Sequence, residues 1–275
     1  MPDVLVTRTS LAAQLRAAGV GPGRIVLVHA SLRSMGFVCG GAVTVVQALL
    51  DVVAPDGTIA MPAHSSSLSD PSHWVNPLVP PEWWPAIRAE MPAFDARLTP
   101  TTAMGAIAET FRRFPGTRRS RHPSGSFAAR GPAASRIVRG HSLSHSFGER
   151  SPLARLCDLD ALVLLLGAGH GSNTSLHLAE ERWGGLPTIR QGAPVTQRGL
   201  RVWRTFDEPA YDADDFPAIG EAFEAAGHVR RFRAGATEAL VMSQRALVDF
   251  GVSWMRRHRS VGSPRQPGAT SPDSR

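Results

Sequence analysis

The spacing of hydrophobic positions predicts that strands and helices alternate along this chain. Residues 24–30 (RIVLVHA) and 161–166 (ALVLLL) are short apolar runs, which is the pattern of strands buried on both faces. Between residues 42 and 53 the valines and leucines recur at helical spacing, and residues 58–63 (TIAMPA) form another apolar run. A strand, a helix and a second strand in this order predict a parallel pair joined by a right-handed crossover.

The rest of the pattern predicts one α/β domain over residues 1–259. It favours helices at residues 8–19, 102–114, 133–140 and 216–226, a small C-terminal hairpin over 193–206, and a short strand with a final helix within 236–257. Residues 64–100 and 115–132 are irregular, so we expect loops there, and a loop as long as the first usually carries function. We therefore expect a mostly parallel central sheet flanked by helices. Residues 260–275 have the Gly, Ser and Pro content of a disordered tail.

A glycine-rich turn directly after the apolar run 161–166 holds the strongest candidate for catalysis. The turn reads GAGHG and is followed by Asn, Thr and Ser, which are N-cap residue types, so a helix begins near Leu176 and places His177 in its first turn. Ligands of open α/β sheets bind beyond the carboxyl ends of the strands, and histidine exchanges protons near neutral pH. The alternative is a core histidine that is hydrogen-bonded to the backbone.

Two carboxylates follow His177 on the same predicted helix. Glu180 and Glu181 lie three and four residues further on, so either can contact the imidazole ring. A carboxylate on one ring nitrogen would fix the tautomer and raise the basicity of the other nitrogen. We expect Glu181 to have this role, with Asp70 and Glu221 as more distant alternatives.

The loop over residues 31–41 (SLRSMGFVCGG) is a candidate site for a phosphate-bearing cofactor. Glycines before a helix leave backbone N–H groups free at the positive end of the helix dipole, and Arg33 could pair with a phosphate there. The alternative is a turn that needs glycine only for its geometry. The loop is not a Walker loop, because the chain has no Gly-Lys-Ser/Thr string and no lysine. The glycines at 167–171 also miss the dinucleotide fingerprint, since the third comes one residue early.

Composition narrows the choice of partners. The formal charge is +7, and all basic residues other than histidine are arginines, which concentrate around residues 112–121 and at the C-terminal end. Positive charge attracts nucleic acid and anionic cofactors alike, but no nucleic-acid-binding motif is present, so we expect no nucleic-acid partner. No apolar run is long enough to span a membrane and no signal peptide is evident. Cys39 and Cys157 form no disulfide framework, which favours the cytoplasm.

Several histidines invite a metal-site interpretation. His141 and His145 are four residues apart, and His64, Asp70 and His73 are close in sequence. These spacings match no defined zinc motif and no cysteine pair supports them, so we expect no metal. A metal-dependent amidohydrolase is nevertheless the competing enzyme class, and a non-catalytic CoA-binding module is the alternative without catalysis.

Four stretches together resemble the aminoglycoside 3-N-acetyltransferase family of antibiotic N-acetyltransferases. The resemblance extends from about residue 8 to about residue 258. The stretches are VLVHASLRSMGFVCGGAVTVVQALLDVV, TIAMPAHS, NPLVPPEWWPAIRAEMPAFDARLTPTTAMGAIAETFRRFPGTRRSRHPSGSFAARG and LLGAGHGSNTSLHLAEE.

The resemblance implies an antibiotic acetyltransferase fold distinct from the common N-acetyltransferase superfamily. It implies transfer of acetyl from acetyl-CoA to the 3-amino group of a 2-deoxystreptamine aminoglycoside, which gives antibiotic resistance. It places CoA near the first glycine loop and the histidine of the Ser-Leu-His motif, His177, at the reaction centre. The cofactor contacts expected on this basis are Ser31, Leu32, Arg33, Gly36, Gly40, Gly41, Ala42, Thr102 and Met104.

The chemistry of acetyl transfer to an amine indicates which residues act as the base and which bind the substrate. A protonated amine has no lone pair, so a base must remove a proton, and we expect His177 to be that base in a direct transfer without a covalent intermediate. The substrate is a polycation, so its pocket should be acidic, while the positive patches face CoA. The candidate substrate carboxylates are Asp70, Glu149, Glu180, Asp212, Asp214, Asp215 and Glu221. We expect a monomer or a homodimer.

Overall fold

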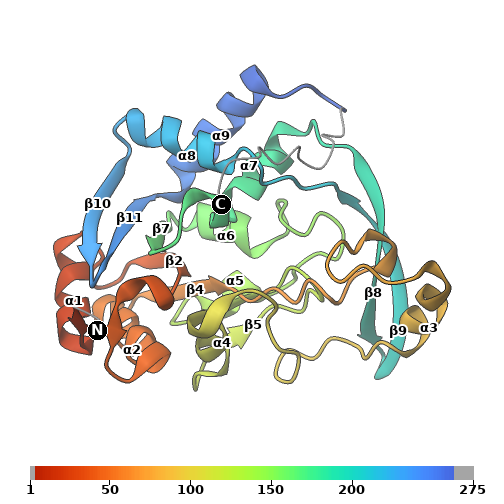
Figure 1. Ribbon diagram of the computed structural model, residues 1–275, viewed down its shortest axis with the longest axis horizontal. Coiled ribbons are helices and arrows are strands. Elements are labelled where there is room, and N and C mark those ends of the chain that lie inside the picture. Colours follow the sequence, from red (N-terminus) through yellow and green to blue (C-terminus); the bar gives the residue numbers. More distant parts are fainter. Residues whose placement is uncertain (1–3, 263–275) are drawn as a thin grey trace, which may run out of the picture.

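A computed structural model describes residues 4–262 of the chain. Its core is a seven-stranded sheet with the order β10-β11-β7-β2-β4-β6-β5 (Figure 1). At the centre, β2 (Ile25–Ala30) lies between β4 (Thr58–Pro62) and β7 (Leu162–Leu166) and is parallel to both. These three strands are the three apolar runs of the sequence, and the α/β fold class is confirmed.

The outer strands correct the expectation of a mostly parallel sheet. On one side β11 (Thr237–Ser243) and β10 (Val229–Ala234) follow β7, and on the other β6 (Phe127–Arg130) and β5 (Arg118–Arg119) follow β4. All four of these pairings are antiparallel, so only two of the six strand pairings in the sheet are parallel. The sheet is therefore mixed.

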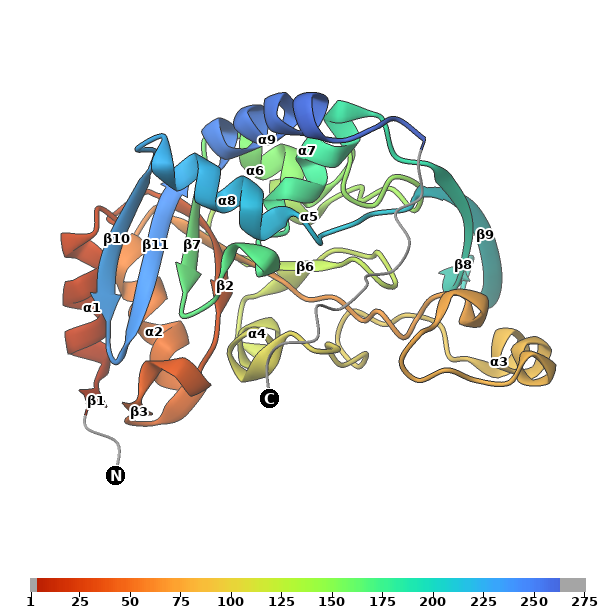
Figure 2. The same cartoon turned by 45° about the horizontal axis from the view of Figure 1, so that its top comes forward.

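Helices cover both faces of the sheet and make three layers. Figure 2 shows α1 (Arg8–Ala17), α2 (Gly41–Val53) and α4 (Gly105–Arg113) on one side, with α6 (Pro152–Asp158), α7 (Ser175–Trp183), α8 (Phe216–Ala225) and α9 (Gln244–His258) on the other. Alternate residues of a strand point to opposite faces, so Val26 and Val28 join the first core while Leu27 joins the second. Both faces of the central strands are buried, which explains their continuous hydrophobicity.

The predicted hairpin is present but longer than expected. Its strands β8 (Thr188–Gln197) and β9 (Leu200–Pro209) pair only with each other, and they turn at Arg198-Gly199, where both residues have positive φ. Figure 1 shows the hairpin beside the short helix α3 (Trp84–Glu90), and the Arg201 side chain connects them by donating to the Met91 carbonyl at 2.8 Å. The irregular segment 64–100 is thereby held against the hairpin.

The remaining elements are short. Strand β1 (Leu5–Val6) pairs in parallel with β3 (Phe37–Val38), α5 (Ala134–Val138) packs beside β6, and single 3-10 turns occur at η1 (Arg33–Met35), η2 (Pro71–His73), η3 (Pro81–Trp83) and η4 (His170–Ser172). Residues 263–275, most of the predicted tail, lie outside the described residues. Between residues 4 and 262, no helix combines the length and apolar character that crossing a bilayer requires.

Candidate active site

A cavity of about 920 Å³ opens at the carboxyl ends of the three parallel strands. Its walls include the ends of β2 and β4, the turn after β7 and the first residues of α4. Gly167 makes the turn possible, because its φ is +66° and a Cβ atom there would lie 2.0 Å from the Ser34 hydroxyl oxygen. This is the edge of the sheet at which α/β proteins bind their ligands.

His177 lines this cavity from the first turn of α7. Its Nδ1 lies 2.6 Å from Oε2 of Glu180. The imidazole ring stacks on Phe147, with ring centroids 4.8 Å apart, and meets the rings of Tyr211 and Phe216 edge-on. The ring is thus clamped on several sides, and Nε2 has no partner among the described residues.

The carboxylate beside His177 belongs to Glu180, which corrects the expectation of Glu181. The Glu180 side chain is completely buried and also accepts from Nη1 of Arg259 at 2.6 Å and from the backbone N–H of Asp212 at 3.1 Å. Glu181 instead accepts from the Tyr211 hydroxyl and lies 2.9 Å from Nδ1 of His145. Of the two neighbouring glutamates, the one on the buried face of α7 is therefore the partner of His177.

Arg259 completes the environment of Glu180 and was missed in the sequence analysis. It follows the last helix, and its side chain is only 4% exposed. Its Nε donates to Asp215 at 2.7 Å, and the guanidinium lies over the Trp183 ring. Burial alone would lower the pKa of Arg259, but hydrogen bonds to Asp215 and Glu180 raise it above its ordinary value. Nothing in its local sequence distinguishes it from the other arginines near the C-terminal end.

Two further histidines near His177 are neutral. Burial, and to a lesser extent the nearby His177, lowers the pKa of His29 to about 3. His64 lies between the rings of Phe127 and Phe147, and burial together with the charge of His177 lowers its pKa to about 3 as well. Among these histidines only His177 is both in contact with a carboxylate and exposed to the cavity.

The cofactor contacts expected from the sequence divide into two groups. Ser31, Leu32, Arg33 and Met104 line the cavity, whereas five do not: Gly36, Gly40, Gly41, Ala42 and Thr102. The chain turns away after η1, because β3 pairs with β1 and carries the start of α2 away from the carboxyl edge. The cavity wall therefore contains no residue from the start of α2. It is formed instead by residues 103–106 at the start of α4 and by residues 167–169, 171 and 172 after β7.

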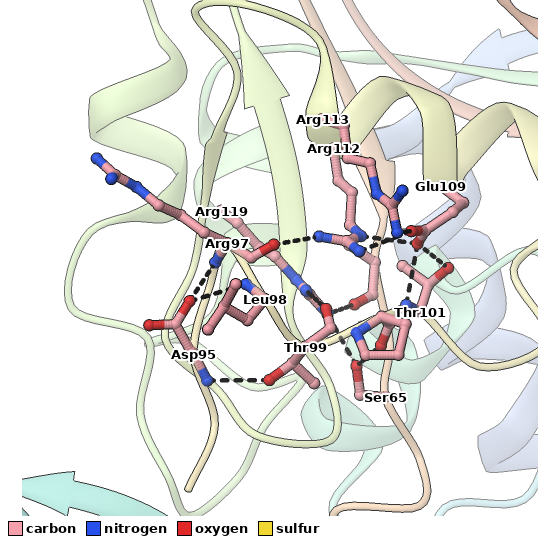
Figure 3. Close-up of polar contacts among 12 residues, drawn as sticks. Ser65, Asp95, Arg97, Leu98, Thr99, Thr101, Glu109, Arg112, Arg113 and Arg119 are labelled. Atoms are coloured by element: carbon pink, nitrogen blue, oxygen red, sulfur yellow. Dashed lines mark hydrogen bonds and ion pairs between the residues drawn. The ribbon is translucent and has the colours of Figure 1, made fainter.

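A polar network holds the segment that leads to Met104 (Figure 3). Glu109 accepts from the Thr101 backbone N–H at 3.0 Å and from both Nε and Nη2 of Arg112. Burial would raise the pKa of Glu109, but these hydrogen bonds, first that of Arg112, lower it to about 2. Arg119 donates to the carbonyls of Thr99 and Ala63 at 2.5 Å each. The network fixes residues 99–101 just before the cavity wall.

Several predicted substrate carboxylates are already neutralised by arginines. Asp70 is buried and accepts two hydrogen bonds from Arg88, at 2.7 and 3.0 Å. Glu149 pairs with Arg182 at 2.8 Å. Glu180 and Asp215 are buried against Arg259, so neither offers a carboxylate to a substrate. The expectation for Asp70, Glu180 and Asp215 is corrected accordingly.

The other predicted carboxylates differ in surroundings. Glu221 and Asp214 are exposed, and Asp212 is half-buried, with Oδ1 accepting from the Asp214 backbone N–H. The basic segment 112–121, expected to face the cofactor, lies elsewhere: Arg33 is the one arginine that lines the cavity within the part of the chain that the structure describes.

A pair of carboxylates next to His177 was not anticipated in this form. Glu181 and Glu208 approach the loop at residues 145–148 and have no arginine partner within residues 4–262. Glu208 is buried, and this burial raises its pKa to about 7. Tyr211 donates to Glu181 and packs against His177, so one side chain connects Glu181 to the histidine.

Comparison with known proteins decides the family. The model of the aminoglycoside 3-N-acetyltransferase family matches residues 27–256. The chain belongs to this family. It is therefore an acetyltransferase with the antibiotic acetyltransferase fold, and its family uses acetyl-CoA. Arg259 lies just beyond the matched region.

Relatives of this acetyltransferase align over nearly the whole chain. A Bacillus subtilis protein described as the SPbeta prophage-derived aminoglycoside N(3')-acetyltransferase-like protein YokD is 45% identical over 90% of this chain and 92% of its own length. The crystal structure of YokD has a TM-score of 0.90 over 92% of this chain and 94% of its own. Aminoglycoside N(3)-acetyltransferase VII of Streptomyces paromomycinus is 38% identical over 97% and 96%.

One of the similar structures was solved with CoASH. AAC-IIIb, solved as a binary complex with CoASH, is 33% identical to this acetyltransferase and has a TM-score of 0.83 over 94% of this chain and 100% of its own. The metal-dependent amidohydrolase and the non-catalytic module find no support among these relatives. The residues proposed for a metal also have other partners, since Asp70 pairs with Arg88 and both ring nitrogens of His141 are within 2.9 Å of other polar atoms.

Proposed function

We propose that this acetyltransferase transfers the acetyl group of acetyl-CoA to the 3-amino group of a 2-deoxystreptamine aminoglycoside, and that it thereby gives antibiotic resistance. The name of the Streptomyces paromomycinus relative, an aminoglycoside N(3)-acetyltransferase, supports the position of the reacting amine. The complex of AAC-IIIb with CoASH supports the cofactor. Cys39 and Cys157 are both free thiols, which fits a reaction in the reducing cytoplasm.

The observation that carries this proposal is the contact between His177 and Glu180 at the edge of the cavity. With Nδ1–H donating to the Glu180 carboxylate, Nε2 carries a lone pair and is the atom that lacks a protein partner. Nε2 then removes the proton from the substrate amine as the amine attacks the thioester carbon. The C–S bond breaks as the tetrahedral intermediate collapses, and the departing CoA sulfur takes up the proton from His177 to leave as the thiol. Phe147 on one face and Tyr211 and Phe216 at the edges keep the ring from turning away.

Arg259 has a defined part in this mechanism. As His177 takes up a proton, the new positive charge is stabilised by Glu180, which must itself be ionised. A fully buried carboxylate tends to hold its proton, and the contact with Arg259 opposes this tendency. Asp215 in turn compensates the charge of Arg259. Arg259 is thus a positioning residue that acts through Glu180.

The cavity wall supplies the remaining functions. Arg33 is the charged group available to the phosphates of CoA, and the turn at residues 167–169 offers backbone N–H groups near the reacting carbonyl, where negative charge develops. Glu181 contacts Tyr211, which packs against His177, and it has no arginine partner among the described residues, so it is the carboxylate that favours a cationic substrate.

The cysteines provide no covalent route to the product. Cys39 does not line the cavity, and burial raises the pKa of the Cys157 thiol, which keeps it protonated. A direct transfer in one step is therefore favoured over an acetyl-enzyme.

The test is release of CoA thiol from acetyl-CoA in the presence of single aminoglycosides. We expect release that depends on a 2-deoxystreptamine amine, and a product acetylated at the 3-amino group by NMR spectroscopy. An aminoglycoside that lacks this amine serves as the matched control and should release no thiol. Equal release with both, or acetylation at another amine, contradicts the proposal.

A further inference from the structure

A second cavity, of about 890 Å³, lies at the opposite end of α4 from the active site. It is bounded by the end of α4, by β5, by α5 and by the loop at residues 96–97. Within the described residues its lining contains no acidic side chain and seven arginines: Arg97, Arg112, Arg113, Arg118, Arg119, Arg121 and Arg139. We call this cavity the arginine hollow.

The arginine hollow concentrates positive charge. It is lined by seven of the 30 basic residues of the chain and by no carboxylate among the described residues. A concentration of like charge of this kind raises the potential inside a hollow and attracts anions.

Two buried arginines, Arg112 and Arg119, form the floor of the arginine hollow and are held in place by hydrogen bonds. Arg112 and Arg119 are each less than a tenth exposed. Glu109 and the Arg97 carbonyl hold Arg112, while Arg119 donates to the carbonyls of Thr99 and Ala63 (Figure 3). Burial and then the charge of Arg112 lower the pKa of Arg119 to about 10, as expected where positive groups are crowded together.

Four arginines around this floor have no partner of their own. The side chains of Arg97, Arg118, Arg121 and Arg139 make no hydrogen bond or ion pair with any described residue. The carboxylates closest to the hollow are otherwise engaged: Glu109 pairs with Arg112 and Arg113, and Asp95 accepts from the backbone N–H groups of Arg97 and Leu98. Asp95 attracts Arg97 and Arg121 only through space, so the guanidinium groups of all four arginines keep their hydrogen-bond donors free of described partners.

We propose that the arginine hollow binds a small anion that carries several phosphate groups. Guanidinium groups match phosphate oxygens in pairs, and four arginines without partners suit a ligand with more than one phosphate. The volume lies within the usual range for small-ligand pockets, and the enclosure by α4, β5 and α5 gives a bounded hollow instead of the long stripe that nucleic acid follows.

This site is separate from the acetyl-CoA cavity. The two cavities share no lining residue, because residues 103–106 and Ala108 border one and Arg112 to Phe114 border the other. The proposal stands on the arginine hollow alone and does not depend on the identity of the acetyl acceptor.

The test measures binding of inorganic triphosphate by isothermal titration calorimetry at constant ionic strength. We expect saturable binding to one site, and at least a tenfold loss of affinity when Arg118, Arg121 and Arg139 are all replaced by Gln. These side chains make no hydrogen bond or ion pair with any residue in 4–262, so the variant should unfold close to the wild-type temperature. The matched control replaces the exposed arginines Arg24, Arg204 and Arg256 by Gln, removing the same charge away from both cavities.

Four outcomes overturn the proposal. An equal loss in the control variant shows general attraction to a basic protein. Displacement of triphosphate by acetyl-CoA shows binding in the active-site cavity. Tighter binding of a single-stranded oligonucleotide than of triphosphate, lost in the same triple variant, shows that the hollow serves nucleic acid instead. Full retention of triphosphate affinity in the single variant Arg139→Gln and in the triple variant also contradicts it.

Discussion

At the scale of single residues, the environment of Glu180 explains why this carboxylate, and not Glu181, is the partner of His177. Glu180 is completely buried between an imidazole and a guanidinium, and each is 2.6 Å from one of its oxygens. The neighbouring Glu181 differs only by one position in sequence, but its oxygens contact Tyr211 and His145. Sequence spacing allowed either glutamate, because positions three and four residues away share a helix face. The choice depends on Arg259, which comes from a distant segment.

These two glutamates provide a matched pair of substitutions. In Glu180→Gln, the amide can no longer stabilise the charge that His177 acquires, so kcat should fall by about 10²-fold or more. Glu181→Gln should leave kcat within a few-fold of wild type and act mainly on the KM for the aminoglycoside. Steady-state kinetics of both folded variants measures the difference. Equal effects on kcat contradict the assignment of Glu180.

Removal of Arg259 should change the pH profile. The base works when deprotonated, so activity falls as the pH drops and the base takes up a proton. Loss of the buried positive charge in Arg259→Gln makes proton uptake at the His177–Glu180 pair more favourable, and the acidic limb of kcat/KM should move to higher pH by about 1–3 pH units. His29, His64, Tyr211, Glu181 and Asp215 also face this pair and stay in place.

The pH dependence of kcat/KM in Arg259→Gln distinguishes a positioning role of Arg259 from a purely structural one. Activity should recover at high pH, and Arg259→Lys, which keeps the charge, should stay close to the wild-type midpoint. An unchanged midpoint with a uniform loss of activity at every pH means that Arg259 is only structural.

The raised pKa of Glu208 predicts how the stability of the fold depends on pH. Its pKa is raised to about 7 from an ordinary value of 4.5, so the folded state keeps a proton that the unfolded state releases between these values. Stability therefore falls as pH rises from about 4.5 to 7, by no more than about 3 kcal/mol. Glu208→Gln should remove this fall, so denaturant unfolding should show a gain at pH 8 and little change near pH 4.5. An equal gain in the free energy of unfolding at both pH values shows that the titration of Glu208 is not the cause of the pH dependence.

At the scale of elements, the sequence predicted the parts that are locally encoded. The strands β2, β4 and β7 were evident because burial on both faces demands continuous apolar residues, and α2 because its apolar stripe is regular. Strands β5 and β6 were missed because they are short and lie between turn residues. Strand β10 (VRRFRA) was missed because an edge strand tolerates arginines. These are the antiparallel additions that make the sheet mixed.

The turn after β7 is the element on which the cavity depends. Gly167→Ala should lower the free energy of unfolding by about 1–3 kcal/mol, because its φ is +66° and a Cβ would overlap the Ser34 hydroxyl. Gly169→Ala is the matched control: its φ is negative, and a Cβ there meets no atom within 4 Å. Denaturant unfolding of both variants gives the comparison. Equal destabilisation by the two substitutions shows that the close approach to Ser34 is unimportant.

At the scale of the whole molecule, the sheet brings separate segments to one edge. Ser31, Leu32 and Arg33 could be predicted as site residues because they directly follow an apolar strand, and the carboxyl ends of parallel strands meet. His177 could be predicted because it lies in the first turn of the helix that follows another such strand. Gly40 and Gly41 lie outside the cavity lining, and the sequence could not indicate this because the pairing of β1 with β3 is not visible in local sequence. The neutralisation of Asp70 by Arg88 and of Asp215 by Arg259 could not be foreseen either, since each pair joins distant segments.

The central claim is that His177 is the base for acetyl transfer at this edge of the sheet. The most direct measurement is kcat of His177→Ala and His177→Gln with a 2-deoxystreptamine aminoglycoside, together with the Kd of each variant for acetyl-CoA. Both variants should bind acetyl-CoA as the wild type does and lose about 10²–10⁴-fold in kcat, since neither side chain accepts the proton. A folded His177→Ala enzyme that keeps near-normal turnover contradicts the claim.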